Sequence, residues 1–153
     1  MELNNENRQV LLTLLGYGQE NLRVMRERVL GITTTSITLY MLFVGWIIQK
    51  DSTPKLVEII SLSVVILVFW IGSILVLRDI SRGFISAHKI IIRIEKCLDL
   101  YKPGVFLTDE SLFPEKYSIP TRAEHFKKFE YILSFSAGIS IFMLLTDYFF
   151  SKT

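Results

Sequence analysis

The chain has 153 residues, of which 50% are hydrophobic and 21% charged, and its formal net charge is +2 at pH 7. Soluble domains of this size are less apolar and more charged, whereas nucleic-acid-binding domains carry a clustered basic patch. The composition therefore predicts a multi-pass membrane protein, and we expect no nucleic-acid partner. The single cysteine, Cys97, has no second thiol with which to form an intramolecular disulfide.

Residues 1–28 are predicted to form an amphipathic helix on the cytoplasmic side. Apolar residues recur at near-helical spacing among charged ones, at Val10, Leu11, Leu14, Leu15, Leu22 and Met25. Gly16 and Gly18 are expected to interrupt or bend this segment. Two placements remain open for its apolar face, which lies either on the membrane surface or on the cytoplasmic part of the same chain.

Two apolar runs of bilayer-spanning length follow, at residues 29–48 and 56–77. The short hydrophilic turn between them makes the pair an antiparallel transmembrane hairpin. Small residues fall on one face of the first span, namely Gly31, Thr35, Thr38 and Gly45. Because small residues let helices approach closely in lipid, we predict that this face packs on another helix or on a second copy of the chain. A hydrophilic pore lining uses the same residues and is the alternative.

The second span is predicted to continue beyond the membrane as one long helix that ends at residues 101–104, where Pro103 and Gly104 favour a stop. From residue 78 onwards this helix carries a heptad seam of Ile80, Phe84, Ala87, Ile91, Ile94 and Leu98. The seam packs either on the N-terminal helix of the same chain or on the same helix of a neighbouring subunit.

A cytoplasmic segment is predicted over residues 78–130, with a loop at 103–120. Thr121 and Glu124 form a capping box that begins the next helix. The third transmembrane helix follows at residues 131–150, and Ser134 and Gly138 lie on its small-residue face. The predicted fold class is therefore all-α, an integral membrane protein with three transmembrane helices and cytoplasmic helical extensions.

The distribution of Lys and Arg predicts the orientation of these spans. Four precede the first span, two lie in the first turn, ten lie between the second and third spans, and one lies in the tail. Positively charged residues favour the cytoplasmic side of a membrane. The N-terminus and the long middle segment are therefore expected in the cytoplasm, and the C-terminus outside.

The sequence carries little that resembles catalytic chemistry. It lacks a glycine-rich phosphate loop, and its two histidines have no third metal ligand beside them. We therefore expect a non-enzymatic protein with no cofactor and with no catalytic or metal-binding residues. Arg82 and His88 resemble the R-x4–6-H motif of HEPN ribonucleases, although Gly83 follows the arginine where that motif places Asn, Asp or His. A HEPN-like ribonuclease is a remote alternative.

Two segments after the membrane hairpin carry a family resemblance, RGFISAHKIIIRIEKCL at residues 82–98 and LFPEKY at residues 112–117. With the amphipathic lead-in and the hairpin, they follow an order that resembles that of small RipA-like oligomeric inner-membrane proteins of bacteria. The resemblance implies a ring-like homo-oligomer with a cytoplasmic vestibule, in the bacterial cytoplasmic (inner) membrane. It carries over no enzymatic residues.

The sequence thus predicts a non-enzymatic multi-pass membrane protein that self-associates and presents a cytoplasmic helical surface to a partner. The alternative is a small oligomeric channel or membrane-permeabilising effector, in which the threonines between residues 33 and 38 line the path. The expected partners are membrane lipid, further copies of the chain and a cytoplasmic protein.

Overall fold

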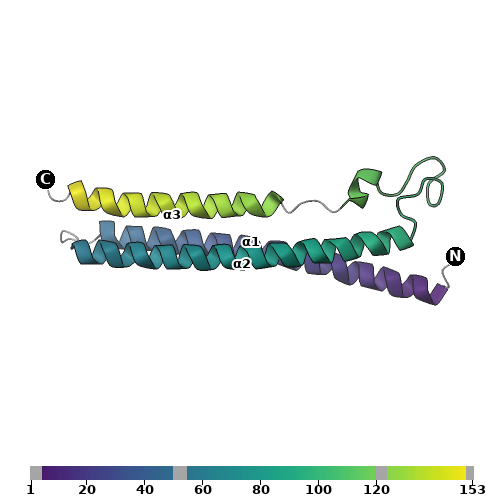
Figure 1. The fold of residues 1–153 in the computed structure, drawn as a ribbon, viewed down its shortest axis with the longest axis horizontal. Helices are drawn as coiled ribbons and strands as arrows, with labels where there is room; N and C mark the ends of the chain where they lie inside the picture. Colours follow the sequence, from purple (N-terminus) through teal and green to yellow (C-terminus); the bar gives the residue numbers. More distant parts are fainter. Residues whose placement is uncertain (1–4, 50–54, 120–123, 151–153) are drawn as a thin grey trace. The chain divides into compact units, whose positions relative to one another are not determined.

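A computed structural model of the chain describes residues 5–49, 55–119 and 124–150. Within these ranges the chain forms three α-helices, α1 (Asn5–Ile48), α2 (Leu56–Cys97) and α3 (Glu124–Phe150), and one short 3-10 helix, η1 (Glu115–Ser118), and no strand (Figure 1). The predicted all-α fold class is confirmed. All three α-helices are long and apolar enough to cross a membrane, which supports a membrane location.

The chain divides into two compact units. We call them the helix-pair unit (Met1–Glu27 and Ile80–Glu124) and the three-helix unit (Arg28–Asp79 and His125–Thr153). The helix-pair unit contains the first part of α1, the last part of α2 and the segment that follows α2. The three-helix unit contains the remaining parts of α1 and α2 together with nearly all of α3. Both α1 and α2 therefore contribute to each unit as unbroken helices.

In the helix-pair unit, the heptad seam of α2 faces α1 of the same chain. Phe84, Ile91 and Leu98 of the seam are buried, as is Leu22 of α1. The Arg26 guanidinium of α1 lies over the Phe84 ring, 5.5 Å from its centroid. Leu22 and Arg26 of the amphipathic part of α1 thus pack on α2 of the same chain, whereas Val10 and Leu14 of its predicted apolar face are exposed.

Gly18 is the point of closest approach between these two helix segments. A Cβ atom built on Gly18 would lie only 2.8 Å from Cγ1 of the buried Ile91. Gly16 and Gly18 were predicted to interrupt or bend this segment, and the interruption is wrong, because α1 is helical throughout this stretch. Glycine costs a helix about 1 kcal/mol relative to alanine, and here the packing of α1 on α2 outweighs that cost.

The C-terminal end of α2 is a Schellman cap. Asp99 has a φ of 58°, in the left-handed region. The Leu100 N–H donates to the Glu95 carbonyl and the Asp99 N–H donates to the Lys96 carbonyl, both at 3.1 Å. These two bonds satisfy carbonyl groups that the end of a helix otherwise leaves without partners.

The predicted end of this helix at residues 101–104 is therefore wrong, because α2 ends earlier, at Cys97. Aspartate tolerates the left-handed conformation better than most residues, so Asp99 ends the helix before Pro103 is reached. Gly104 also has a positive φ, of 79°, and shapes the chain after the cap. α3 begins by Glu124, and the predicted capping residue Thr121 lies outside the described residues.

The close contact at Gly18 generates a stability prediction. Gly18→Ala should lower the midpoint of thermal unfolding, measured by circular dichroism in nanodiscs, because the added methyl group meets Ile91. Overpacking of this kind costs about 1–3 kcal/mol. Gly16→Ala is the matched control, because a Cβ there has no neighbour within 4 Å. It should leave the midpoint unchanged or raise it. Equal shifts in the two variants would contradict this account of the contact.

Candidate functional site

One face of α1 is buried within the three-helix unit. Its members are Val29, Thr33, Ser36, Tyr40, Val44 and Ile47. The Ser36 and Ser73 hydroxyl groups lie 2.9 Å apart and form a hydrogen bond between α1 and α2. The spacing of the set follows a helical stripe at about 100° per residue. This is the face by which α1 packs inside its own chain.

The predicted small-residue face of α1 lies elsewhere. Gly31, Thr35 and Thr38 are exposed and Gly45 is half-buried. A Cβ built at Gly31 or Gly45 meets nothing within 4 Å. By helical geometry this face is centred about 180° from the buried face. Packing among the described residues therefore does not account for the exposed Gly31, Thr35 and Thr38.

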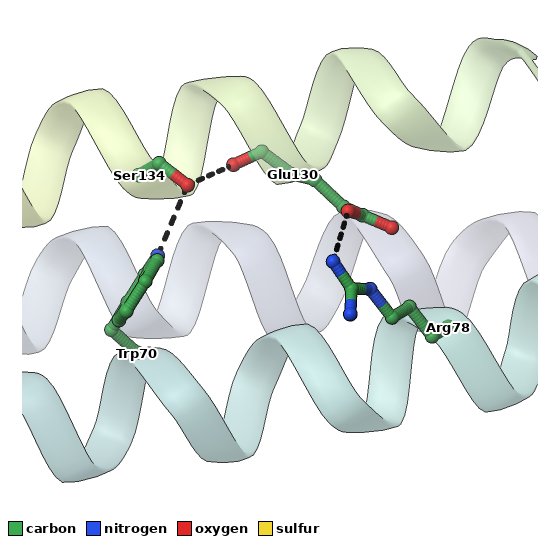
Figure 2. A network of polar contacts seen from close by, with 4 residues as sticks. All are labelled: Trp70, Arg78, Glu130 and Ser134. Atoms are coloured by element: carbon green, nitrogen blue, oxygen red, sulfur yellow. Dashed lines mark hydrogen bonds and ion pairs between the residues drawn. The ribbon is translucent and has the colours of Figure 1, made fainter.

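A polar network joins α2 to α3 in the three-helix unit (Figure 2). The Trp70 indole N–H donates to the Ser134 hydroxyl at 3.1 Å, and that hydroxyl donates to the Glu130 carbonyl at 2.8 Å. The Arg78 guanidinium donates to the Glu130 carboxylate at 3.4 Å. These contacts fix the two helices against each other at the end of the unit where the apolar run of α2 stops.

Basic side chains gather at this end of the unit. Because Ser36 of α1 faces Ser73 of α2 and the two helices run antiparallel (Figure 1), Arg28 and Arg78 lie at the same end. Lys127 and Lys128 belong to the turn of α3 that precedes Glu130. All four basic side chains are exposed, and the acidic Asp79 and Glu130 lie among them. Their formal charges sum to +2, from four cations and two carboxylates.

In the helix-pair unit, a buried carboxylate ties the segment after α2 to the helix. Glu95 is only 9% exposed, and its carboxylate accepts a hydrogen bond from the Tyr101 hydroxyl. The same hydroxyl also donates a hydrogen bond to the Tyr117 carbonyl, at 3.3 Å. Burial, together with the hydrogen bond and charge of Glu95, raises the pKa of Tyr101 well above its ordinary value of 10.0. The phenol therefore remains a donor throughout the neutral range.

Arg82 and His88, the two residues of the HEPN-like motif, both lie on α2. Arg82 is exposed. The His88 imidazole is half-buried and stacks on the Phe84 ring, with centroids 6.1 Å apart and an interplanar angle of 27°. Its buried Nδ1 has no hydrogen-bond partner among the residues that the structure describes. The structure thus brings His88 to an aromatic ring of the seam.

The remaining predicted residues divide between the two units. Ala87 and Ile94 of the seam are half-buried beside Ile91, and Ile80 is half-buried at the beginning of the seam. On α3, Ser134 belongs to the polar network, whereas Gly138 is exposed and its Cβ position is open. In residues 5–49, 55–119 and 124–150, no three His, Cys, Asp or Glu side chains come together to hold a metal ion.

Sequence reasoning missed Trp70, Arg78 and Glu130 as interacting residues. The sequence does carry a signal for the contact between Arg78 and Glu130. Arg78 is the first charged residue after the apolar run of α2, and Glu130 is the last charged residue before the apolar run of α3. Two neighbouring spans with charges at the same membrane boundary are expected to bring those charges together. The hydrogen bond from Trp70 to Ser134 depends on the rotation of both helices, which the sequence does not specify.

Comparisons of the chain with protein-family models, curated proteins and solved structures returned no match.

The contact between Tyr101 and Glu95 generates a second prediction. Tyr101→Phe should lower the thermal midpoint, because the buried Glu95 carboxylate loses its donor at a cost of about 1–3 kcal/mol. The raised pKa of Tyr101 also fixes a pH dependence. Its stabilising effect is present below the ordinary tyrosine pKa of about 10 and is lost as the pH rises further, when the unfolded chain ionises first.

Tyr117→Phe is the matched control, because Tyr117 contributes only its backbone carbonyl to this contact. The midpoint of thermal unfolding of Tyr117→Phe should equal that of the unaltered chain at each pH from neutral to alkaline. The interpretation is wrong if Tyr101→Phe and Tyr117→Phe unfold at the same temperature near pH 7.

Proposed function

We propose that the chain is a non-enzymatic multi-pass membrane protein that self-associates through the small-residue face of α1 and presents its helix-pair unit to a cytoplasmic partner. The observation that supports this most directly is the position of that face, on the side of α1 opposite its buried stripe. The face is therefore available to a second copy of the chain.

Helices in lipid are held together by different forces from helices in water. Lipid tails are as apolar as leucine, so association depends on close van der Waals packing and on hydrogen bonds between helices. Glycine lets the backbones of two helices approach closely, and threonine offers a hydroxyl group for a hydrogen bond between them. Large apolar side chains suit contact with lipid instead, and α1 exposes Leu30 and Met41 beside the small-residue face.

The proposed orientation rests on the charge distribution. The Lys and Arg residues before the first span and between the second and third spans favour a cytoplasmic helix-pair unit. The resemblance of residues 82–98 and 112–117 to RipA-like proteins supports a bacterial inner membrane and a ring of identical subunits. In such a ring, the helix-pair units of neighbouring copies would surround a cytoplasmic vestibule.

The surface that we propose for a partner lies on the first part of α1. The heptad seam is covered by α1, but Val10, Leu14 and Tyr17 of α1 are exposed at positions i, i+4 and i+7. This spacing puts them on one helix face, as in peptides that anchor a helix in an apolar groove. A cytoplasmic protein with such a groove is the partner that this face suits.

A small oligomeric channel or membrane-permeabilising effector is the second candidate, and it uses the same face. Thr35 and Thr38 are exposed, whereas Thr33 is buried and donates its hydroxyl to the Val29 carbonyl. A path between copies would therefore be lined by Thr35 and Thr38, and ion flux from liposomes would distinguish it from a closed assembly. The remote ribonuclease alternative depends on Arg82 and His88 alone.

Self-association is tested by enlarging the small-residue face. The combined substitutions Thr35→Leu and Gly45→Leu should raise the dissociation constant of the assembly about tenfold, since misfit packing costs about 1–3 kcal/mol. The particle mass in mild detergent, measured over a dilution series, reports this change. Leu30→Phe and Met41→Phe enlarge exposed side chains outside the face and should leave the mass unchanged. A monomer of the unaltered chain at every concentration would contradict the proposal.

A further inference from the structure

A groove runs between α2 and α3 on the surface of the three-helix unit. Its volume is about 250 Å³, and the polar network of Figure 2 borders it. Ile71, Ile74 and Leu75 of α2 form its apolar wall, Trp70 lies at one end, and Arg78 and Glu130 lie at the other. Cavities of about 150 Å³ are large enough to hold benzene, so this groove has room for part of a lipid acyl chain.

The groove changes from polar to apolar along its length. Arg78 directly follows the apolar run of α2, and Trp70 lies within that run. The two positions are separated by about 12 Å along the helix axis, at about 1.5 Å per residue. The hydrogen bond from Trp70 to Ser134 holds the indole ring in place as the apolar end of the groove. A phospholipid has the same order of parts, with its phosphate at the membrane boundary and its acyl chains below.

The charge at the polar end favours an anion. The Arg78 side chain is 58% exposed and donates one hydrogen bond to Glu130, although a guanidinium group carries five N–H donors. Lys127 and Lys128 are exposed on the preceding turn of α3. Glu130 offsets part of this charge, and Asp79 is the other acidic group nearby. Two lysines and an arginine outnumber these two carboxylates.

We propose that this groove binds an anionic phospholipid. One acyl chain lies along Ile71 and Leu75 as far as Trp70, and the phosphate accepts hydrogen bonds from the Arg78 guanidinium. Basic residues near a membrane surface attract anionic lipids, and the apolar wall selects a lipid over a soluble phosphate. The inference depends on a membrane location and not on self-association, so the two proposals fail independently.

The experiment uses the fluorescence of Trp70 in the full chain. The chain has two tryptophans, so Trp46→Phe leaves Trp70 as the only one. The protein is placed in phosphatidylcholine vesicles that contain a minor fraction of either brominated phosphatidylglycerol or brominated phosphatidylcholine, because bromine quenches indole fluorescence on contact. We expect the anionic lipid to quench Trp70 as if enriched about fivefold, the size expected for one basic contact near the surface.

Two variants in the Trp46→Phe background test the source of that preference. Arg78→Gln combined with Glu130→Gln keeps a polar pair of similar size, and it should abolish the preference for the anionic lipid without changing quenching by phosphatidylcholine. Arg28→Gln removes a basic residue from the same end but outside the groove, and it should retain the preference. The helix content of each variant is checked by circular dichroism.

Three results would overturn the proposal. Equal quenching by the two lipids in the Trp46→Phe chain would show that no anionic lipid is selected. A preference that is kept in the double variant but lost in Arg28→Gln would indicate a general surface potential instead of a site, because the double substitution leaves the net charge unchanged. Weak quenching by both lipids would mean that another occupant, such as a second copy of the chain, covers the groove.

Discussion

In each unit α1 lies against α2, at Gly18 and Ile91 in the helix-pair unit and at Ser36 and Ser73 in the three-helix unit. The two contacts use different physical means. A bare glycine lets α1 approach the buried Ile91 closely, and burying an isoleucine side chain away from water contributes about 1.5–3 kcal/mol. Among the apolar side chains of the three-helix unit, the hydrogen bond between two serines fixes the rotation of α1 relative to α2.

The rotation of α1 decides what its other side can do. Once Ser36 and Tyr40 face inward, helical geometry places Thr35 and Thr38 outward. These two small residues are then exposed in the described part of the chain, and the proposed contact with a second copy would give them a packing role. The same reasoning applies to α2, where Arg78 at the end of the apolar run meets Glu130 of α3 and leaves a groove beside Trp70.

Sequence reasoning was sufficient for the long apolar helices and the heptad seam, because both depend on periodic patterns. It was wrong to allow an interruption at Gly18, where a break or a bend was expected, because the helix is continuous there. Local propensity predicts a break there, whereas the packing against Ile91 becomes visible only when α1 and α2 are placed together. Sequence reasoning also placed the end of α2 too late. An aspartate that ends a helix in the left-handed conformation is harder to recognise in a sequence than a proline such as Pro103.

The candidate site was less accessible from the sequence than the fold. The pattern identified Gly31, Thr35, Thr38 and Gly45 as one face, but it did not establish whether that face points inward or outward. The direction of the face depends on which residues of α1 contact α2, and many combinations of polar and apolar residues could form such a contact. The polar network around Trp70 likewise depends on which side chains of α2 are close enough to contact α3.

The most direct test of the account is a disulfide cross-linking scan along α1 in membranes. Cys97→Ser removes the native thiol, and single substitutions such as Thr35→Cys and Tyr40→Cys then sample opposite faces of the helix. The account predicts that covalent dimers form with helical periodicity at Gly31, Thr35, Thr38 and Gly45 and are absent at Ser36 and Tyr40. Cross-linking centred on Ser36 and Tyr40, or equal at all positions, would contradict it.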